Sequence, residues 1–318
     1  MDTALVGDIG GTNARFAIVE LADVGARPQA PRTYNCCDHP SLQAAISAYL
    51  DDMGSSKRPD AVCVAVAGPV TDGVAAFTNL PWRVSEEALR ETGFERARVI
   101  NDYEALAFGI PDLTASDLRP IGATPAPPPG HTLAVMGAGT GFGVSALTRR
   151  KSEELVTAGE GGHASFAPVD ELEVEILRRL AVQFDRVSIE RLLSGPGLLN
   201  IYRAMADIVG ADAPHATPAQ ITAQALAGED LPRHAVERFC SIFGSVAGDF
   251  ALSYGAQGGV YLAGGIAPQL IEVLNRGGFR RAFEAKGRLS PYLTAIPTYV
   301  VTHPHLALIG AARVLKAR

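Results

Sequence analysis

Cysteine is too sparse and too irregularly placed in this chain to predict a disulfide framework or a zinc site. The four cysteines are Cys36, Cys37, Cys63 and Cys240, and no two of them form a C-x-x-C pair. Positive charge is not concentrated either, because the formal net charge is −6 and no extended Lys/Arg-rich segment occurs. The electrostatic footprint of a nucleic-acid-binding protein is therefore missing, and small molecules are the expected partners.

Long apolar runs and basic leader segments are also lacking. The chain opens on Met-Asp-Thr-Ala, an acidic start without a basic flank, and Asp8 interrupts the first apolar stretch. Neither a signal peptide nor a membrane span fits these features, so a cytoplasmic protein without membrane contacts is expected. With 318 residues, 47% of them hydrophobic, the chain has enough material for two ordinary domains.

One pattern, a strand followed by a glycine-rich turn and a second strand, occurs twice. The first turn is Asp-Ile-Gly-Gly-Thr-Asn at residues 8–13, between a strand that ends at Gly7 and one at 15–20. The second is Gly-Ala-Gly-Thr-Gly-Phe-Gly at 137–143, again between two apolar stretches. Other short apolar strands alternate with helical patterns, of which the clearest follows Ser41. The alternation predicts an α/β fold.

A proline-rich break divides the chain. Residues 125–130 read Pro-Ala-Pro-Pro-Pro-Gly, which is typical of a linker. The pattern predicts a small α/β domain over residues 1–110 and a larger one over 111–303. Helices in the larger domain are expected at 171–184, 188–208 and 234–254.

Glycine turns of this kind expose backbone N–H groups without bulky side chains, which suits phosphate binding. A tight β-hairpin, in which glycine supplies only a positive φ, is the alternative for either turn. Rossmann and P-loop motifs need a helix directly after the glycines, and neither turn has one. A third glycine pair, Gly264-Gly265, follows a strand and precedes Pro268 in a predicted helix start, which suits an adenosine diphosphate group.

Acidic residues accompany these turns. Asp8 is suited to hold hydrated Mg²⁺, and Thr12 adds a hydroxyl beside the phosphates. Asp102 follows Asn101 where a strand meets a helix, and a plain helix N-cap is its simpler explanation. Gly-Glu-Gly-Gly-His at 159–163 carries an acid and an imidazole on a turn, and Glu190 stands at a capped helix start, where negative charge is favoured in any case.

The order and spacing of these segments resemble bacterial glucokinases, in the hexokinase, Hsp70 and actin superfamily. The resemblance runs along nearly the whole chain through Leu5–Asn13, Asn101-Asp102, 137–143, 159–163, Ser188–Gly197 and Leu262–Pro268. It implies two ribonuclease-H-like α/β lobes with a cleft between them, a C-terminal helix 304–318 that returns to the first lobe, and a homodimer. No cysteine-rich zinc motif follows His163, unlike in the related repressor and kinase group.

The resemblance also implies roles for single residues. Asp102 is the expected catalytic base for ATP- and Mg²⁺-dependent phosphorylation of glucose at its 6-hydroxyl. The residues expected to bind the sugar are Asn101, Asp102, Glu160, His163 and Glu190. The residues expected to bind the nucleotide are Gly7, Asp8, Ile9, Gly10, Gly11, Thr12, Gly139, Thr140, Gly141, Gly264 and Gly265.

Three alternatives stay open at this point. A kinase for another hexose or an N-acetylhexosamine would use a similar set of hydroxyl-binding side chains. A sugar sensor on the same fold would normally need an added DNA-binding segment, whereas this sequence opens on the phosphate-turn strand. An Hsp70- or actin-like ATPase would share the glycine turns but gives no reason for Glu160, His163 and Glu190. The phosphate donor, whether ATP, ADP or polyphosphate, is also open.

Overall fold

The chain divides into two compact units, described separately here. Unit 1 comprises Met1–Ser116 and His303–Arg318, and unit 2 comprises Asp117–Thr302. The computed structural model describes residues 3–21, 27–54, 58–77, 80–122, 128, 130–150 and 153–316. Most of the linker predicted at 125–130 therefore lies outside the described residues.

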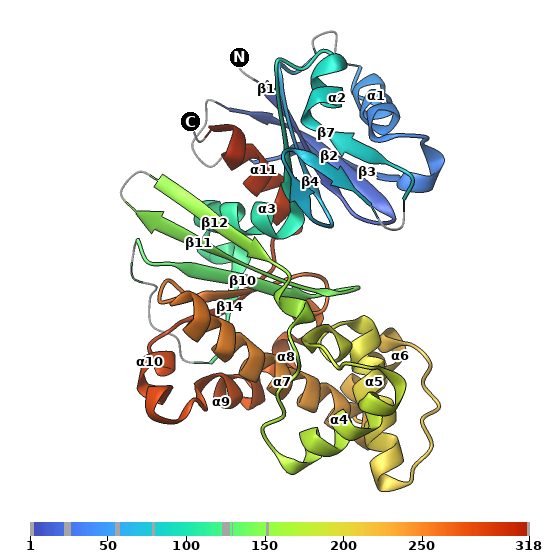
Figure 1. Ribbon diagram of the computed structural model, residues 1–318, viewed down its shortest axis with the longest axis vertical. Coiled ribbons are helices and arrows are strands. Elements are labelled where there is room, and N and C mark those ends of the chain that lie inside the picture. Colours follow the sequence, from blue (N-terminus) through green and yellow to red (C-terminus); the bar gives the residue numbers. More distant parts are fainter. Residues whose placement is uncertain are drawn as a thin grey trace. The chain divides into compact units, whose positions relative to one another are not determined.

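A five-stranded sheet forms the centre of unit 1, in the order β3-β2-β1-β4-β8 (Figure 1). β1 (Thr3–Ile9) pairs antiparallel with β2 (Asn13–Glu20), which pairs with β3 (Gln29–Asn35). On its other side β1 runs parallel to β4 (Ala61–Val66), and β4 runs parallel to β8 (Arg96–Asn101). The carboxyl ends of β1, β4 and β8 consequently meet at one edge of the sheet.

Helices cover both faces of this sheet, which explains why β4 and most of β1 are apolar. Leu5 and Ile9 of β1 pack with α1 (Leu42–Asp52) on one face. The alternate positions Ala4 and Val6 pack with α11 (Leu306–Lys316) on the opposite face. Ser41 caps α1 as predicted, since its hydroxyl oxygen accepts the Ala44 N–H at 3.2 Å.

The remaining elements of unit 1 surround the sheet, and η denotes a 3-10 helix. They are η1 (Cys36–Asp38), β5 (Val70–Thr71), β6 (Val74–Ala76), β7 (Arg83–Ser85), α2 (Glu86–Glu91), α3 (Asp102–Gly109), η2 (Ile110–Asp112), η3 (Ala115–Asp117, which ends in unit 2) and α11 (Leu306–Lys316).

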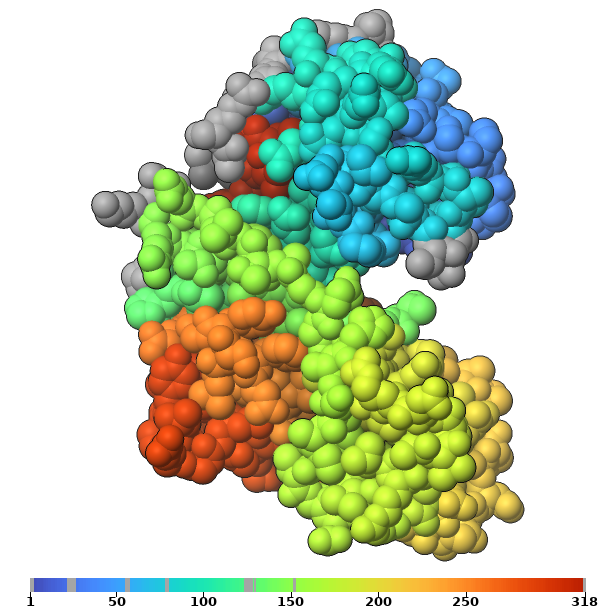
Figure 2. Space-filling view, viewed as in Figure 1, coloured from blue at the N-terminus to red at the C-terminus, as the bar shows by residue number. Residues whose placement is uncertain are grey.

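Unit 2 repeats the pattern of unit 1 in its own six-stranded sheet, ordered β12-β11-β10-β13-β14-β9. Its strands are β9 (Leu118–Pro120), β10 (Leu133–Ala138), β11 (Phe142–Arg150), β12 (Glu153–Gly159), β13 (Val260–Ala263) and β14 (Thr298–Val301). β10 pairs antiparallel with β11 and parallel with β13, as β1 does with β2 and β4. β12 lies at the sheet edge and none of its residues is buried. Its segment is visible at the surface in Figure 2.

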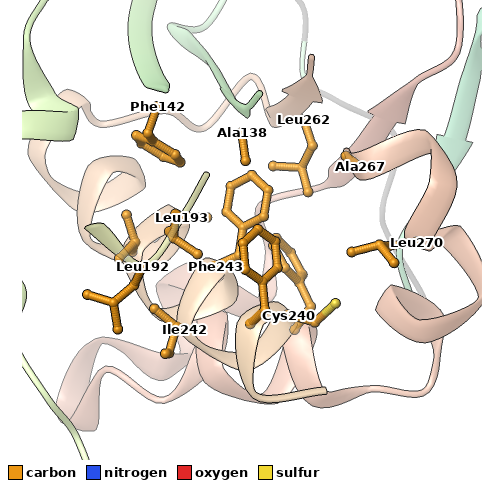
Figure 3. Packing of buried hydrophobic residues seen from close by; sticks show 14 of the residues in the cluster. Ala138, Phe142, Leu192, Leu193, Cys240, Ile242, Phe243, Leu262, Ala267 and Leu270 are labelled. Carbon is orange, nitrogen blue, oxygen red and sulfur yellow. The ribbon is translucent and has the colours of Figure 1, made fainter. Parts of the chain in front are cut away.

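The helices of unit 2 form its core together with β10. They are η4 (Gly161–His163), α4 (Glu171–Gln183), η5 (Ile189–Arg191), α5 (Gly195–Val209), α6 (Pro218–Ala227), α7 (Asp230–Tyr254), η6 (Ala267–Leu270), α8 (Ile271–Asn275), α9 (Gly278–Glu284), η7 (Gly287–Leu289) and α10 (Ser290–Thr294). Phe142 of β11 and Phe243 of α7 meet in this core with ring centroids 5.7 Å apart (Figure 3).

Two predicted helix boundaries in unit 2 are wrong. The helix expected from residue 188 begins instead at Gly195, where Ser194 caps it by accepting the Gly197 N–H at 3.0 Å. The helix expected from Pro268 is a 3-10 turn followed by the five residues of α8. In the part of the chain that the structure describes, no helix is long and apolar enough to cross a membrane.

The C-terminal helix packs against α3 at the distance of backbone contact. A Cβ atom at Gly310 of α11 would lie 1.7 Å from the Ala105 carbonyl oxygen of α3. One turn along α3, a Cβ at Gly109 would lie 2.7 Å from the Leu306 carbonyl oxygen. Because these obstacles are backbone atoms, only glycine permits this crossing, and α3 is the helix that begins at Asp102.

We predict that Gly310→Ala lowers the free energy of unfolding by about 1–3 kcal/mol, because α3 and α11 must separate to admit a methyl group. Urea denaturation of the purified variant measures this change. Gly278→Ala in α9 is the matched control, since a Cβ there meets nothing within 4 Å. A loss of stability that is equal in the two variants would contradict the packing argument.

Candidate functional site

The first part of the candidate site lies at the carboxyl edge of the unit 1 sheet. Ile9, Val66 and Asn101 are paired in register across β1, β4 and β8. The segments that follow them therefore emerge side by side: the Gly10–Thr12 turn, the loop at Gly68, and the start of α3 at Asp102. In open α/β sheets ligands bind outside the carboxyl ends of parallel strands.

The first glycine turn is not a hairpin that needs left-handed backbone. Gly10 donates its N–H to the Asn13 carbonyl oxygen at 2.9 Å without a positive φ. Cys36 supports the turn from beneath, because its N–H binds the Thr12 carbonyl oxygen at 2.8 Å and its thiol lies 3.7 Å from the Gly10 carbonyl oxygen. Gly11 and Thr12 remain exposed at the tip, so this turn can offer its tip to a ligand.

Two residues predicted in this turn, Asp8 and Ile9, lie in strand β1 instead, as does the predicted nucleotide-binding residue Gly7. Ile9 is fully buried, so its side chain has no access to a ligand. Gly7 serves packing, since a Cβ there would lie 2.9 Å from a Val64 methyl group. The predicted turn was too long because β1 continues to pair with β4 up to Ile9.

Asp8 is a charged residue near this edge, in strand β1. Its carboxylate lies 3.4 Å from the Arg15 guanidinium, and 30% of its side chain is exposed. Burial raises the pKa of Asp8 above its ordinary value, and the Arg15 charge works in the opposite direction. Among the described residues no group of three His, Cys, Asp or Glu side chains gathers to hold a metal. Mg²⁺ commonly keeps several waters and uses one or two carboxylates, so Asp8 alone fits such an ion.

Asn101, and not Asp102, caps helix α3. The Asn101 amide oxygen accepts the N–H groups of Tyr103 at 2.9 Å and Glu104 at 3.3 Å, and its amide nitrogen donates to the Gly68 carbonyl oxygen at 2.9 Å. Asn101 thus ties the loop after β4 to the start of α3. Asp102 follows as the first helical residue and is half-buried. The simple N-cap explanation of Asp102 is therefore wrong.

The second part of the candidate site lies at the equivalent edge of the unit 2 sheet. The turn Gly139-Thr140-Gly141 joins β10 to β11, and neither glycine has a positive φ. The Glu190 carboxylate accepts the Phe142 N–H at 2.9 Å. A Cβ at Gly141 would lie 2.5 Å from the same Glu190 oxygen. Glu190 therefore lies directly against the turn, and a side chain at position 141 would displace its carboxylate.

The Gly161-Gly162 pair is packed tightly and does not serve as a flexible hinge. A Cβ at Gly162 would lie 2.1 Å from the Phe142 carbonyl oxygen. The Ala164 carbonyl oxygen accepts the Ile189 N–H at 2.9 Å, which joins this segment to the one that carries Glu190. Close backbone approach therefore explains the glycines of this turn.

Glu160 and His163 project from this packed turn into solvent. Their side chains are 67% and 57% exposed, and the His163 Nε2 lies 3.9 Å from a Glu160 carboxylate oxygen. Neither side chain contributes to the core, although the backbone between them is held firmly. This arrangement suits side chains that bind a ligand.

The third glycine pair adjoins the second turn. Gly264 has φ +84°, and a Cβ there would lie 2.8 Å from the Ala138 carbonyl oxygen. Gly265 is open, with nothing within 4 Å of a Cβ. The sequence missed one further neighbour, because the Gly195 N–H at the start of α5 donates to the Gly139 carbonyl oxygen at 2.8 Å. The Ser-Gly-Pro-Gly run at 194–197 is the signal that marks this helix start.

Comparison with known proteins identifies the family. The glucokinase family model matches residues 5–318. A glucokinase from Caulobacter sp. (strain K31) is 51% identical over 311 residues, which cover 97% of this chain and 93% of that relative. The chain belongs to the glucokinase family.

Solved structures of glucokinases share the fold. The glucokinase from an Antarctic psychrotroph matches with a TM-score of 0.90 and 38% identity over 99% of each chain. A ROK family glucokinase from Streptomyces griseus, solved with glucose and AMPPNP, matches over 98% of each chain with a TM-score of 0.66. At 18% identity that likeness concerns the fold alone. The α/β fold expected from the resemblance to glucokinases is confirmed.

We predict that Glu190→Ala lowers the free energy of unfolding by about 1–3 kcal/mol, because it leaves the N–H of the buried Phe142 without its acceptor. Glu190→Gln should cost clearly less, since an amide oxygen can take the same hydrogen bond. Chemical denaturation of both variants measures the difference. Glu160→Ala, which removes an exposed carboxylate of unit 2, is the control and should leave stability unchanged. Equal losses for Ala and Gln at position 190 would rule out this hydrogen bond as the cause.

Proposed function

We propose that this member of the glucokinase family transfers the γ-phosphoryl group of ATP to the 6-hydroxyl of D-glucose. The observation that carries the proposal is that acidic side chains lie near a glycine turn in each unit. Asp102 follows the carboxyl end of β8 at the sheet edge where the Gly10–Thr12 turn emerges. Glu160 and His163 follow β12, and Glu190 binds the Phe142 N–H after the Gly139–Gly141 turn. Relatives named glucokinase at 51% and 44% identity over nearly the whole chain support the same reaction.

The nucleotide is assigned to the glycine turns. Phosphoryl transfer depends on positioning and on charge stabilisation more than on covalent chemistry by the protein. Gly10–Thr12 and Gly139–Gly141 offer backbone near the sheet edges, and Gly264-Gly265 offers an open surface for the rest of the nucleotide. The AMPPNP bound by the Streptomyces griseus relative supports ATP as donor. Mg²⁺, held by Asp8 through water, would neutralise phosphate charge.

The sugar is assigned to the acidic and amide side chains. Glu160, His163 and Glu190 belong to unit 2, and Asn101 and Asp102 belong to unit 1. Glu190 and Asn101 each hold backbone N–H groups within their own unit. Both side chains are therefore held in place, and a sugar that does not match them leaves polar groups unpaired.

Asp102 is assigned as the base that accepts the proton of the 6-hydroxyl while the new O–P bond forms. Asn101 caps α3, and Asp102 is the first residue of that helix. The position of the Asp102 backbone is therefore stabilised by the cap that Asn101 provides. Base catalysis of this kind contributes on the order of 10²–10⁴ in rate. We also propose a homodimer, as the resemblance implies, and a cytoplasmic location, as the sequence features predict. Light scattering of the purified protein tests the dimer.

The proposed function is tested by ADP release with purified protein, ATP and Mg²⁺ on glucose, mannose, fructose and N-acetylglucosamine. Glucose should support by far the highest kcat/KM. A preference for another sugar in the panel would transfer the proposal to a different hexose or N-acetylhexosamine kinase. Sugar binding without turnover on any of the four would favour the sensor.

We predict that Asp102→Asn lowers kcat by roughly 10²–10⁴-fold while the affinity for glucose changes little. The amide keeps the size and one acceptor of the carboxylate but cannot accept the proton. Steady-state kinetics and glucose titration measure the two quantities separately. Asp51→Asn, on the exposed end of α1, is the control. Near-normal turnover of the Asp102→Asn variant would remove Asp102 as the base.

A further inference from the structure

Unit 2 contains a pocket that none of the predicted site residues line. It has a volume of about 440 Å³ and lies among α4, α5, α7, α8 and α9, which pack together in the helical part of the unit (Figure 1). Sites for small molecules commonly have volumes of roughly 300–1,000 Å³. The pocket is therefore large enough for a small metabolite.

The floor of the pocket is apolar and uncharged. Leu172, Met205 and Val273 line it with hydrocarbon and thioether groups. Cys240 also lines it, and burial raises the pKa of its thiol to about 12, so that the thiol stays neutral. The floor can accommodate the carbon part of a ligand.

The rim carries three arginines and one glutamate: Arg238, Arg276, Arg281 and Glu237. Arg238 is neutralised within the fold, since it lies 2.6 Å from Asp170 and 3.0 Å from Glu173. These ion pairs join α7, which carries Arg238, to the start of α4. The charge available to a ligand must come from the other two arginines.

Arg276 and Arg281 provide this charge. Glu237 is shared between Arg276 at 3.3 Å and Arg233 at 3.4 Å, so it compensates Arg276 only in part. Among the described residues, no side-chain hydrogen bond or ion pair engages Arg281. Two exposed guanidinium groups thus face the pocket with at most one shared carboxylate between them.

The backbone makes room for Arg281. Gly277 has φ +92°, and a Cβ there would lie 2.9 Å from the Arg281 Nη1. Gly277 directly follows Arg276 in the segment between α8 and α9. Because it has no side chain, the Arg281 guanidinium can lie against the backbone there. A side chain at this position would displace Arg281.

We propose that this pocket binds a small organic phosphate, with its carbon part on the apolar floor and its phosphate between Arg276 and Arg281. A phosphate monoester carries about −1.5 to −2 charge near pH 7 and three acceptor oxygens. Guanidinium groups match such oxygens with paired N–H donors. A monocarboxylate supplies less charge and fewer acceptors, so it satisfies the two arginines less fully.

Calorimetric titration with glycerol 3-phosphate tests the proposal on the full chain. Glucose and a non-hydrolysable ATP analogue are present throughout, so that binding at the phosphate turns is already saturated. We expect one glycerol 3-phosphate per chain and much weaker binding of glycerol or inorganic phosphate alone. A signal that is absent in this titration and occurs only in a parallel titration without the ATP analogue would assign binding to the nucleotide site and overturn the proposal.

Variants of the rim separate this pocket from any other anion site. Arg276→Ala and Arg281→Ala should each weaken binding of glycerol 3-phosphate roughly tenfold or more. Arg288→Ala, which removes another exposed arginine of unit 2, is the matched control and should leave the affinity unchanged.

Glu237→Gln should change the affinity in the opposite direction. It removes the carboxylate that competes for Arg276 and repels the phosphate, so binding should become several-fold tighter. Unaltered affinity in both arginine variants, or absence of any binding to the parent protein, would refute the pocket as a phosphate site. Weaker binding in Glu237→Gln would refute the charge argument.

Discussion

The backbone N–H and the backbone carbonyl oxygen of Phe142 fix the geometry of the site in unit 2. Its N–H holds the Glu190 carboxylate at 2.9 Å, and its carbonyl oxygen lies where a Cβ of Gly162 would stand. The Phe142 ring is buried and packs against Phe243 in the core (Figure 3). Because protein cores are closely packed, the core transmits its rigidity to the turn Gly139–Gly141 and to both acidic segments.

The glycines of these turns do not supply the left-handed backbone for which tight hairpin turns commonly use glycine. Gly10, Gly139 and Gly141 do not have a positive φ, so the turns do not depend on left-handed backbone. At Gly141 and Gly162 the absent Cβ leaves room for a carboxylate and for a carbonyl oxygen. These glycines permit close approach, which both tightens the site and leaves backbone available to a ligand.

Local patterns predicted much of this architecture. The repeated strand, glycine turn and strand, and the helix after Ser41, follow from periodicity and capping within a few residues of sequence. The contact between Glu190 and Phe142 joins residues 48 apart, and no local pattern encodes it. The capping of α3 could not be assigned either, because Asn101 and Asp102 are adjacent and both residue types cap helices. Likewise Ser188 and Ser194 both precede candidate helix starts, and Pro196 in the first turn favours the second.

Asp8 shows how a functional demand and the fold oppose each other at one position. Burial raises the pKa of its carboxyl, so the fold disfavours the charged form, and Arg15 at 3.4 Å compensates only in part. The proposed role needs that charge, because a neutral carboxyl group does not attract a hydrated cation. A cation that arrives with the nucleotide would favour ionised Asp8, so ligand binding would supply the compensation that the polypeptide lacks. A carboxylate placed at a strand end without full compensation is therefore better explained by a ligand than by folding stability.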